Sequence, residues 1–252
     1  MRSLKTWLVR LGGARALIVF GDSLVVDRWR WIRTHLPRET SNLVDAGCGN
    51  GWLALNCARL GHHTLGLGWD DNDLTQARSR AGVLSSSARF EVQDLRDLAS
   101  RPDLTASFDV VTCTEVIEHI IDDSKLMANL ATLLRPEGQL LLTAPSSDYI
   151  PMDVGDAGPF EAIEDGRHVR KGYSPDGLRG LAEAANLRVV EIGYCSGRAS
   201  QRLTRLLRAL TRSIGYGPAW ALTFPLRILP PAIDRPTQNW PPYSICLVAS
   251  KG

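Results

Sequence analysis

The sequence predicts an α/β fold in which seven strands form a doubly wound, mostly parallel sheet between layers of helices. Short apolar runs alternate with helix-like segments from residue 42 onward, which is the pattern of strands joined by crossover helices. A chain of 252 residues can bury one large core, so we expect a single domain with insertions. The predicted strands span residues 43–46, 64–67, 89–92, 108–112, 139–144, 188–194 and 243–249.

Helix start and stop signals lie between these runs. Ser174 is a predicted cap and Pro175 occupies the first position of the helix "SPDGLRGLAEAANL", which precedes a β-branched run. In "RPEG" at 135–138, Pro136 blocks a helix and Gly138 permits a tight turn. We therefore expect one helix to end there and the next strand to begin.

Two segments flank or interrupt this alternation. Residues 1–41 are predicted to form an N-terminal helical segment that includes "DRWRWIRTHLP" (27–37), ahead of the sheet domain at 42–252. The first residues are basic and apolar, but glycines and two arginines break them up, so a helical flap or surface-lying segment is expected, not a signal peptide or a membrane span. Residues 195–242 are rich in Gly and Pro and form an insertion between the last two strands.

The net charge and the cysteine spacing limit the classes of protein that we expect. A formal net charge of +2 does not by itself indicate nucleic acid or an acidic substrate. The five cysteines include no C-x-x-C pair, and three lie in runs that we expect to be buried. Reduced thiols and a cytoplasmic location are therefore expected, and a disulfide framework is not.

A glycine-rich turn, "VDAGCGNGW" (44–52), directly follows the first predicted strand. Glycines let the backbone approach a ligand closely, and the helix that follows offers free N–H groups. A dinucleotide-binding fingerprint would need glycine at 47, 49 and 52, but position 52 is Trp and the third glycine is Gly51. The turn therefore indicates a different ligand.

Strand, acid and G-x-G-x-G turn together resemble motif I of the class I S-adenosylmethionine (SAM)-dependent methyltransferases. Three further stretches are similar to that family in the right order: "ARFEVQDL" (88–95), "FDVVTCTEVIEHI" (108–120) and "LLRPEGQLLLTAPS" (133–146). The resemblance covers roughly residues 42 to 194. It implies a Rossmann-like, three-layer α/β/α fold whose last strand is antiparallel, and SAM as the cofactor.

The resemblance also implies a set of cofactor-binding residues. The methionine side of SAM would be lined by Asp45, Gly47, Cys48, Gly49 and Gly51, and Glu115 would lie nearby. Asp94 and Leu95 would lie beside the adenine, although Asp94 could instead be a helix cap.

One position departs from the family pattern. Strand two usually ends in an acid that accepts hydrogen bonds from both ribose hydroxyls, and Gly68 stands there. Asp70 could reach the ribose if the turn is re-shaped, or it could simply begin the next helix, where negative charge is favoured.

A second constellation, "EVIEH", places Glu115, Glu118 and His119 at i, i+3 and i+4, which is one face of a helical turn. It follows a parallel strand at the sheet edge where ligands collect. His119 is the candidate general base, since neutral imidazole can remove a hydroxyl proton near neutral pH, and Glu118 is the second catalytic candidate.

The same residues could instead hold a divalent metal such as magnesium. Two carboxylates and an imidazole are plausible ligands, and His168 in "GRHVRKGY" could add a fourth. This set is similar to those of the ubiquinone-biosynthesis-type O-methyltransferases and the small-RNA 2′-O-methyltransferases, which implies Glu115, Glu118, His119 and His168 as ligands. The alternative is that Glu118 and His119 make hydrogen bonds around the cofactor pocket without any metal.

The insertion contains a basic and an apolar stripe. Its arginines, at 198, 202, 205, 208 and 212, are spaced by four, three, three and four residues, and leucines follow the same period. An apolar segment broken by prolines comes next. This pattern favours either a lid over the active site or a peripheral membrane element over 198–231 that reaches a lipid-borne acceptor. A nucleic-acid partner is not expected.

The predicted function is SAM-dependent methyl transfer to an oxygen of a small molecule, glycan or lipid-linked acceptor. Two alternatives stay open: a non-catalytic binding or assembly protein with this fold, which Gly68 suggests, and a metal-dependent RNA 2′-O-methyltransferase. Because the methyl carbon of SAM is already electrophilic, the protein mainly aligns the acceptor and removes its proton.

Overall fold

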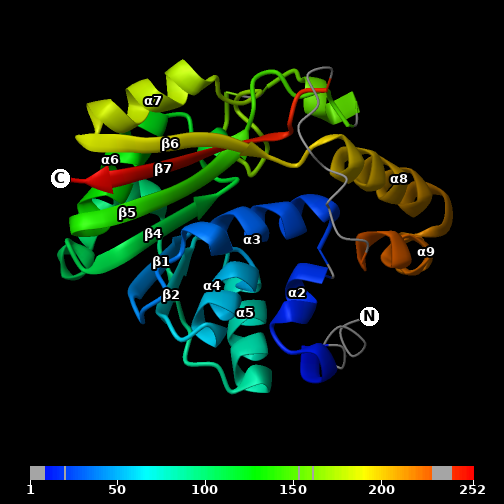
Figure 1. The fold of residues 1–252 in the computed structure, drawn as a ribbon, viewed down its shortest axis with the longest axis horizontal. Helices are drawn as coiled ribbons and strands as arrows, with labels where there is room; N and C mark the ends of the chain where they lie inside the picture. Colours follow the sequence, from blue (N-terminus) through cyan, green and yellow to red (C-terminus); the bar gives the residue numbers. More distant parts are fainter. Residues whose placement is uncertain (1–8, 20, 153, 161, 229–239) are drawn as a thin grey trace.

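The computed structural model describes residues 9–19, 21–152, 154–160, 162–228 and 240–252 (Figure 1). Its centre is a seven-stranded sheet in the order β3-β2-β1-β4-β5-β7-β6. The strands are β1 (Asn42–Ala46), β2 (His63–Gly68), β3 (Arg89–Val92), β4 (Phe108–Thr114), β5 (Leu134–Pro145), β6 (Leu187–Cys195) and β7 (Ser244–Lys251). All seven predicted strands are confirmed, with ends that differ by a few residues.

Pairing directions confirm the predicted doubly wound sheet. β1 pairs in parallel with β2 on one side and with β4 on the other, and the chain then adds β3 and β5 at the two flanks. β7 inserts between β5 and β6 and is antiparallel to both. The carboxyl ends of β1, β2 and β4 therefore meet at one edge of the sheet, on either side of the point where the strand order reverses.

Helices cover both faces of this sheet (Figure 1). α6 (Asp123–Leu133) and α7 (Pro175–Ala184) lie on one face, over a large apolar cluster that includes Val111, Leu142 and Leu247. α3 (Ser23–His35), α4 (Trp52–Arg59) and α5 (Asp71–Leu84) lie on the other. Because both faces are covered, the central strands are apolar along their length.

The N-terminal segment is part of the same body. Asp22 caps α3 by accepting a hydrogen bond from the Val25 backbone N–H, and α2 (Arg15–Val19) precedes it. On α3, Trp29 and Ile32 are buried in a cluster with core residues of four strands, namely Leu43, Val110, Leu141 and Val248. The predicted helix over 27–37 is confirmed, whereas our expectation for residues 1–8 lies outside the described residues.

The insertion forms a helical pair at one end of the molecule (Figure 1). It consists of α8 (Arg198–Ile214) and α9 (Tyr216–Ile228), and residues 229–239 lie outside the described part. α8 packs against α3 and α9. None of the helices among the described residues is both long enough and apolar enough to cross a membrane.

One local prediction is confirmed only in part. α6 ends at Leu133, just before the "RPEG" segment as expected, but β5 begins before this segment and not after it. Residues 135–138 lie inside β5, where the pairing with β4 shifts register and Glu137 takes a φ of 62°. Arg135 holds this irregular segment by an ion pair of 3.0 Å with Asp109.

Candidate functional site

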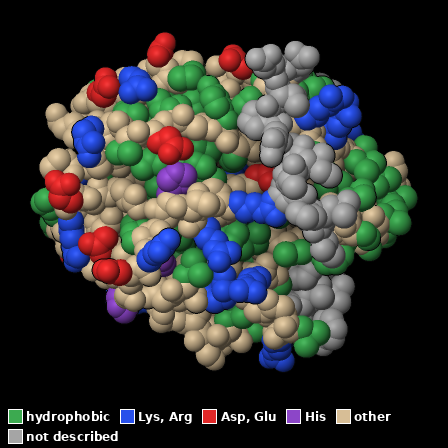
Figure 2. Space-filling model, viewed as in Figure 1, with side chains coloured by type: hydrophobic (Ala, Val, Ile, Leu, Met, Phe, Trp, Pro, Cys, Tyr) green, Lys and Arg blue, Asp and Glu red, His purple; other side chains and the backbone are tan. Residues whose placement is uncertain are grey.

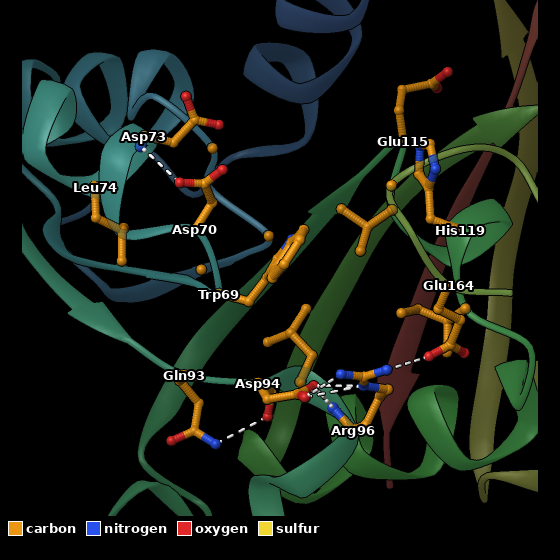
Figure 3. Close-up of a pocket in the computed structure, with 17 residues that line it drawn as sticks. Trp69, Asp70, Asp73, Leu74, Gln93, Asp94, Arg96, Glu115, His119 and Glu164 are labelled. Atoms are coloured by element: carbon orange, nitrogen blue, oxygen red, sulfur yellow. Dashed lines mark hydrogen bonds and ion pairs between the residues drawn. The ribbon is translucent and has the colours of Figure 1, made fainter.

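A cavity of about 380 Å³ lies at the carboxyl ends of β1, β2 and β4 (Figure 3). Of the predicted cofactor-binding residues, six line it: Gly47, Gly49, Asp70, Asp94, Leu95 and Glu115. Asp45, Cys48 and Gly51 do not reach its wall. The predicted segments therefore do form the cavity, but three of the predicted residues lie outside its wall.

The glycine turn curls over the end of β1. Its N–H groups at Gly47 and Cys48 both donate to the Leu67 carbonyl, at 2.9 Å each. Gly47 has a φ of +82°, and a Cβ there would meet Val116 Cγ2 at 2.3 Å. Gly51, with a φ of +79°, caps α4 and leaves room for Ala77 and Phe90. Glycine is thus required at Gly47 for the close approach of the pocket wall and at Gly51 for helix packing.

Asp45 and Cys48 support the turn from inside. The Asp45 carboxylate accepts a hydrogen bond of 3.0 Å from the Thr112 hydroxyl, and burial raises its pKa to about 7. Cys48 is buried, and burial raises the pKa of its thiol. A protonated, enclosed thiol is unreactive, so Cys48 acts as a small apolar side chain.

Both predicted acids of the cavity wall, Asp70 and Asp94, are helix caps. Asp70 accepts hydrogen bonds from the Asn72 and Asp73 backbone N–H groups, at 2.7 and 3.3 Å, and so begins α5. Asp94 accepts from the Arg96 backbone at 2.9 Å and begins the 3-10 helix Leu95–Ser100. Because both residues also line the cavity, a contact with the cofactor stays a prediction for each.

Sequence reasoning missed other residues of the cavity wall, among them Trp69, Asp73, Gln93, Arg96 and Glu164. Trp69 and Asp73 lie within three residues of the predicted Asp70, and this closeness in the sequence could have indicated them. Glu164 had none, because it comes from a distant loop and reaches the cavity through ion pairing with Arg96 (Figure 3).

The "EVIEH" segment does not form the predicted single face. Only Ile117–His119 make a turn of 3-10 helix, and Glu115 has a φ of +52°. This left-handed conformation sends its carboxylate toward Arg28 on α3, at 3.1 Å, and the Ser244 hydroxyl donates to it at 3.2 Å. The Glu115 carboxylate is therefore not part of the group of ligand atoms that Glu118, His119 and His168 bring together.

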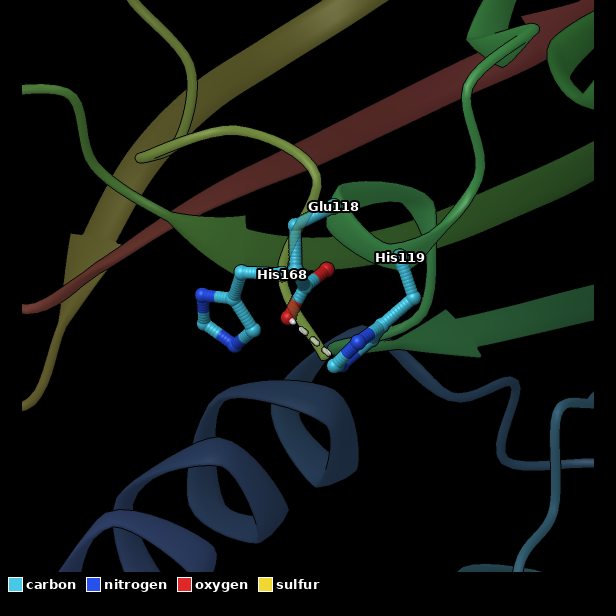
Figure 4. A group of neighbouring side chains, drawn as sticks. All are labelled: Glu118, His119 and His168. Carbon is cyan, nitrogen blue, oxygen red and sulfur yellow. Dashed lines mark ion pairs between the residues drawn. The ribbon is translucent and has the colours of Figure 1, made fainter. Parts of the chain in front are cut away.

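Glu118, His119 and His168 do converge, with one ligand atom of each within 4.8 Å of the others (Figure 4). His119 Nε2 lies 3.8 Å from Glu118 Oε1, and the two imidazoles meet edge to face at 4.7 Å between centroids. The loop that carries His168 is fastened here because the Val169 N–H donates to the Glu118 carbonyl at 3.0 Å. Three of the four predicted ligands are thus brought together.

The electrostatics of this cluster follow from burial. Glu118 is completely buried, and neither carboxylate oxygen has a hydrogen-bond partner among the described residues. Burial, and then the nearby charge of Glu115, raise its pKa well above the usual range. Burial and the proximity of His119 lower the pKa of His168. His119 keeps 28% of its side chain exposed and lines the cavity, so it connects the buried acid to the ligand site.

Comparisons with known proteins agree with this geometry. A family of methyltransferase domains matches residues 27–192. A ubiquinone biosynthesis O-methyltransferase from Thiobacillus denitrificans is 29% identical over 185 residues, which are 72% of this chain and 78% of that protein.

Two solved structures show the same fold at low sequence identity. Phosphoethanolamine N-methyltransferase 2 from Haemonchus contortus, in complex with SAM, has a TM-score of 0.64 at 17% identity and covers 92% of this chain and 55% of its own. The cyclase SpnF has a TM-score of 0.61 at 20% identity, over 88% of this chain and 79% of its own. The family match extends over more than half of the chain, and the sheet order and glycine turn agree with it. The chain therefore belongs to the class I SAM-dependent methyltransferases.

Proposed function

We propose that this methyltransferase acts on a hydroxyl oxygen of a small or lipid-linked acceptor, with His119 as the general base. The observation that carries the proposal is the position of His119, which lines the cavity while the buried Glu118 carboxyl lies directly behind it. The name of the Thiobacillus relative, an O-methyltransferase, supports an oxygen acceptor.

The reaction follows from this placement. SAM bound in this cavity would supply an electrophilic methyl group, and the O–C bond to the acceptor would form as the C–S bond breaks. The hydroxyl proton passes to the His119 imidazole, and S-adenosylhomocysteine leaves. The positive charge that His119 gains favours ionisation of Glu118, whose buried carboxyl group lies 3.8 Å from Nε2, and the ion pair that results stabilises the imidazolium.

Replacement of His119 tests the base. With a panel of catechol and lipid-linked hydroxyl acceptors, we expect His119→Gln to lower the rate of S-adenosylhomocysteine formation about 10²- to 10⁴-fold. Its affinity for S-adenosylhomocysteine should stay within about threefold of wild type, since the imidazole acts on the acceptor. His63→Gln, at the opposite end of β2, is the matched control. A His119→Gln enzyme that keeps wild-type turnover would exclude the proposed base.

The cluster also fits a divalent metal. Two unpartnered carboxylate oxygens beside two imidazoles form a donor set that such an ion accepts, and Glu118, His119 and His168 would hold it. A bound ion would supply Lewis-acid polarisation of the acceptor hydroxyl. Glu115 is not proposed as a ligand, because Arg28 and Ser244 already hold its carboxylate.

The helical pair α8–α9 is proposed as the contact with an anionic membrane surface. Five of its large apolar side chains are exposed: Leu206, Ile214, Tyr216, Leu222 and Leu226. Figure 2 shows hydrophobic side chains gathered at this end of the molecule, next to Lys and Arg side chains. The segment from 193 to 233 contains no acid. Apolar side chains beside arginines, in a segment without acids, are what an interfacial helix presents to anionic lipid.

Not all arginines of α8 are available to a membrane. Arg205 donates to the Pro151 carbonyl at 2.7 Å and Arg208 pairs with Asp156 at 3.1 Å, so both hold the loop that follows β5. Arg198 and Arg202 lie over the Trp240 ring, at 5.4 and 5.6 Å from its centroid, and have no ion-pair partner in the described part of the chain. One side of α8 therefore holds the loop that follows β5, and the other side is the proposed membrane contact.

Sedimentation with vesicles tests this contact. We expect wild type to pellet with vesicles containing phosphatidylglycerol and not with pure phosphatidylcholine. Leu222→Ser/Leu226→Ser and Arg198→Ser/Arg202→Ser should each lower the bound fraction at least about fivefold, because each removes apolar area or attractive charge. Val190→Ser, an exposed apolar position on β6, is the control. Equal vesicle-bound fractions for all variants would exclude α8–α9 as the membrane contact.

A further inference from the structure

The cofactor pocket lacks the acid that usually ends strand two, because Gly68 stands there. The backbone does not require glycine at this position. Gly68 has an ordinary negative φ, and a Cβ would meet only Leu74 and Cys48, at 3.4 Å or more. The end of β2 therefore has space for a side chain at position 68, yet glycine offers none that could accept hydrogen bonds from the ribose.

Two carboxylates near Gly68 line the cavity, and the structure gives them different tasks. Asp70 uses Oδ1 to cap α5, which fixes its orientation. Asp73 lies one turn further along, and its carboxylate has no hydrogen bond or ion pair among the described residues. Figure 3 shows both acids on the same side of the cavity.

The Asp73 carboxylate lies close to the glycine turn of the cavity wall. Its Oδ2 would lie 3.8 Å from a Cβ on Gly49, so the carboxylate stands directly beside the turn that holds the cofactor. The side chain is half-buried, and no cation of the described residues forms an ion pair with it. Arg80, the nearest basic residue that acts on it, donates to the Asn50 carbonyl at 2.6 Å instead. Solvent or a ligand in the cavity must therefore supply the hydrogen-bond donors for this carboxylate.

We propose that Asp73 is the ribose-binding acid of this enzyme and replaces the missing carboxylate at position 68. The two ribose hydroxyls of SAM donate to its carboxylate from the cavity side, between the glycine turn and the first turn of α5. The inference rests on the use of this cavity for SAM. Asp70 then acts as a positioning residue, because its cap fixes the first turn that carries Asp73.

Trp69 completes the adenosine site. Its side chain is 68% exposed, although a large indole usually finds a partner, and it lies in the middle of the residues that line the cavity (Figure 3). An aromatic face at this place offers a stacking surface for the adenine ring. Asp73 and Trp69 would thus recognise the two halves of the nucleoside.

The test is a calorimetric titration with S-adenosylhomocysteine and with its 2′,3′-dideoxy analogue. Asp73→Ala should bind S-adenosylhomocysteine about 10- to 100-fold more weakly than wild type, as expected for hydrogen bonds to a charged acceptor. Asp71→Ala is the matched control. It removes the same charge from the same helical turn, but Asp71 faces Arg78 and lies outside the cavity wall.

The analogue makes the test specific for the ribose. Wild type and Asp71→Ala should each bind the analogue about 10- to 100-fold more weakly than they bind S-adenosylhomocysteine. Asp73→Ala should bind the two compounds with affinities that differ by less than about threefold. Asp73→Asn is the second variant, in case the alanine variant does not give a cooperative thermal transition, and it should lose most of the same affinity.

Two outcomes would overturn the proposal. Equal affinities of Asp73→Ala and Asp71→Ala would exclude a role for Asp73 in binding. A loss with the analogue that is the same in every variant would place ribose recognition elsewhere. If folded wild type bound neither compound, the failure would lie with the use of this cavity for SAM.

Discussion

Arg28 and Glu115 form an ion pair of 3.1 Å that joins the N-terminal segment to the wall of the cofactor pocket. Their side chains keep only 12% and 16% of their exposure, and the Ser244 hydroxyl donates to the same carboxylate. The pair connects α3, the end of β4 and the start of β7. The N-terminal helix α3 is therefore tied to a residue of the cavity wall.

Removal of one partner of this pair should destabilise the fold. We expect Arg28→Met to lower the free energy of unfolding in urea by about 3 kcal/mol, because it leaves Glu115 charged and enclosed without a cation. Arg30→Met, two residues away on the exposed face of α3, should change it by less than about 0.5 kcal/mol. The double variant Arg28→Met/Glu115→Gln should recover part of the loss. A loss equal to that of Arg30→Met would show that the pair contributes nothing.

Asp45 should make stability depend on pH. Its pKa is about 7 in the folded chain and 3.8 by the reference value, so the folded state binds a proton that the unfolded state has released. The stability that the protonated Asp45 side chain contributes to the fold is therefore fully present below about pH 4 and is lost as the pH rises through 7. Relative to Asp45→Asn, the free energy of unfolding of the cofactor-free wild type should fall by about 2 kcal/mol between pH 5 and pH 8. Parallel urea curves for the two proteins at both pH values would contradict this.

Two glycine substitutions should have opposite effects. Gly47→Ala places a Cβ 2.3 Å from Val116 Cγ2 at a φ of +82°, so it should lower the free energy of unfolding by about 2 kcal/mol and weaken SAM binding. Gly82→Ala, on the exposed face of α5 with nothing within 4 Å, should raise it by about 0.5 to 1 kcal/mol. Thermal and urea unfolding of both variants checks the pair. Equal effects would mean that the turn does not need its left-handed conformation.

Metal binding can be measured without turnover. If Glu118, His119 and His168 hold an ion, titration with Mn²⁺ followed by electron paramagnetic resonance should show one site in wild type and at least about tenfold weaker binding in His168→Ala. Glu115→Gln should bind Mn²⁺ within about threefold of wild type, because the Glu115 carboxylate belongs to the Arg28 pair. His63→Ala is the control. Unchanged binding in His168→Ala would exclude the three-ligand site, and a site lost in Glu115→Gln would restore the four-ligand set.

Much of this protein could be predicted from its sequence, because the signals are local. The strands are apolar runs with clear ends, and the glycines at 47, 49 and 51 place a ligand turn directly after the first of them. The cap at Ser174 and the helix over 27–37 are equally local, and the structure confirms both. Such features depend on side-chain size and backbone freedom within a few residues, so no knowledge of the tertiary structure is needed.

Only the tertiary structure decided which side chains meet at the site. The spacing of "EVIEH" predicts one helical face, but the φ of +52° at Glu115 turns its carboxylate to Arg28, 87 positions earlier in the numbering. His168 and Glu164 reach the site on a loop whose path is set by a backbone hydrogen bond and an ion pair. Asp73 stands out as a free acceptor because its neighbours Asp70 and Arg80 have other partners. Sequence periodicity fixes side-chain direction only within a regular element, whereas a single left-handed residue or a long-range contact changes it.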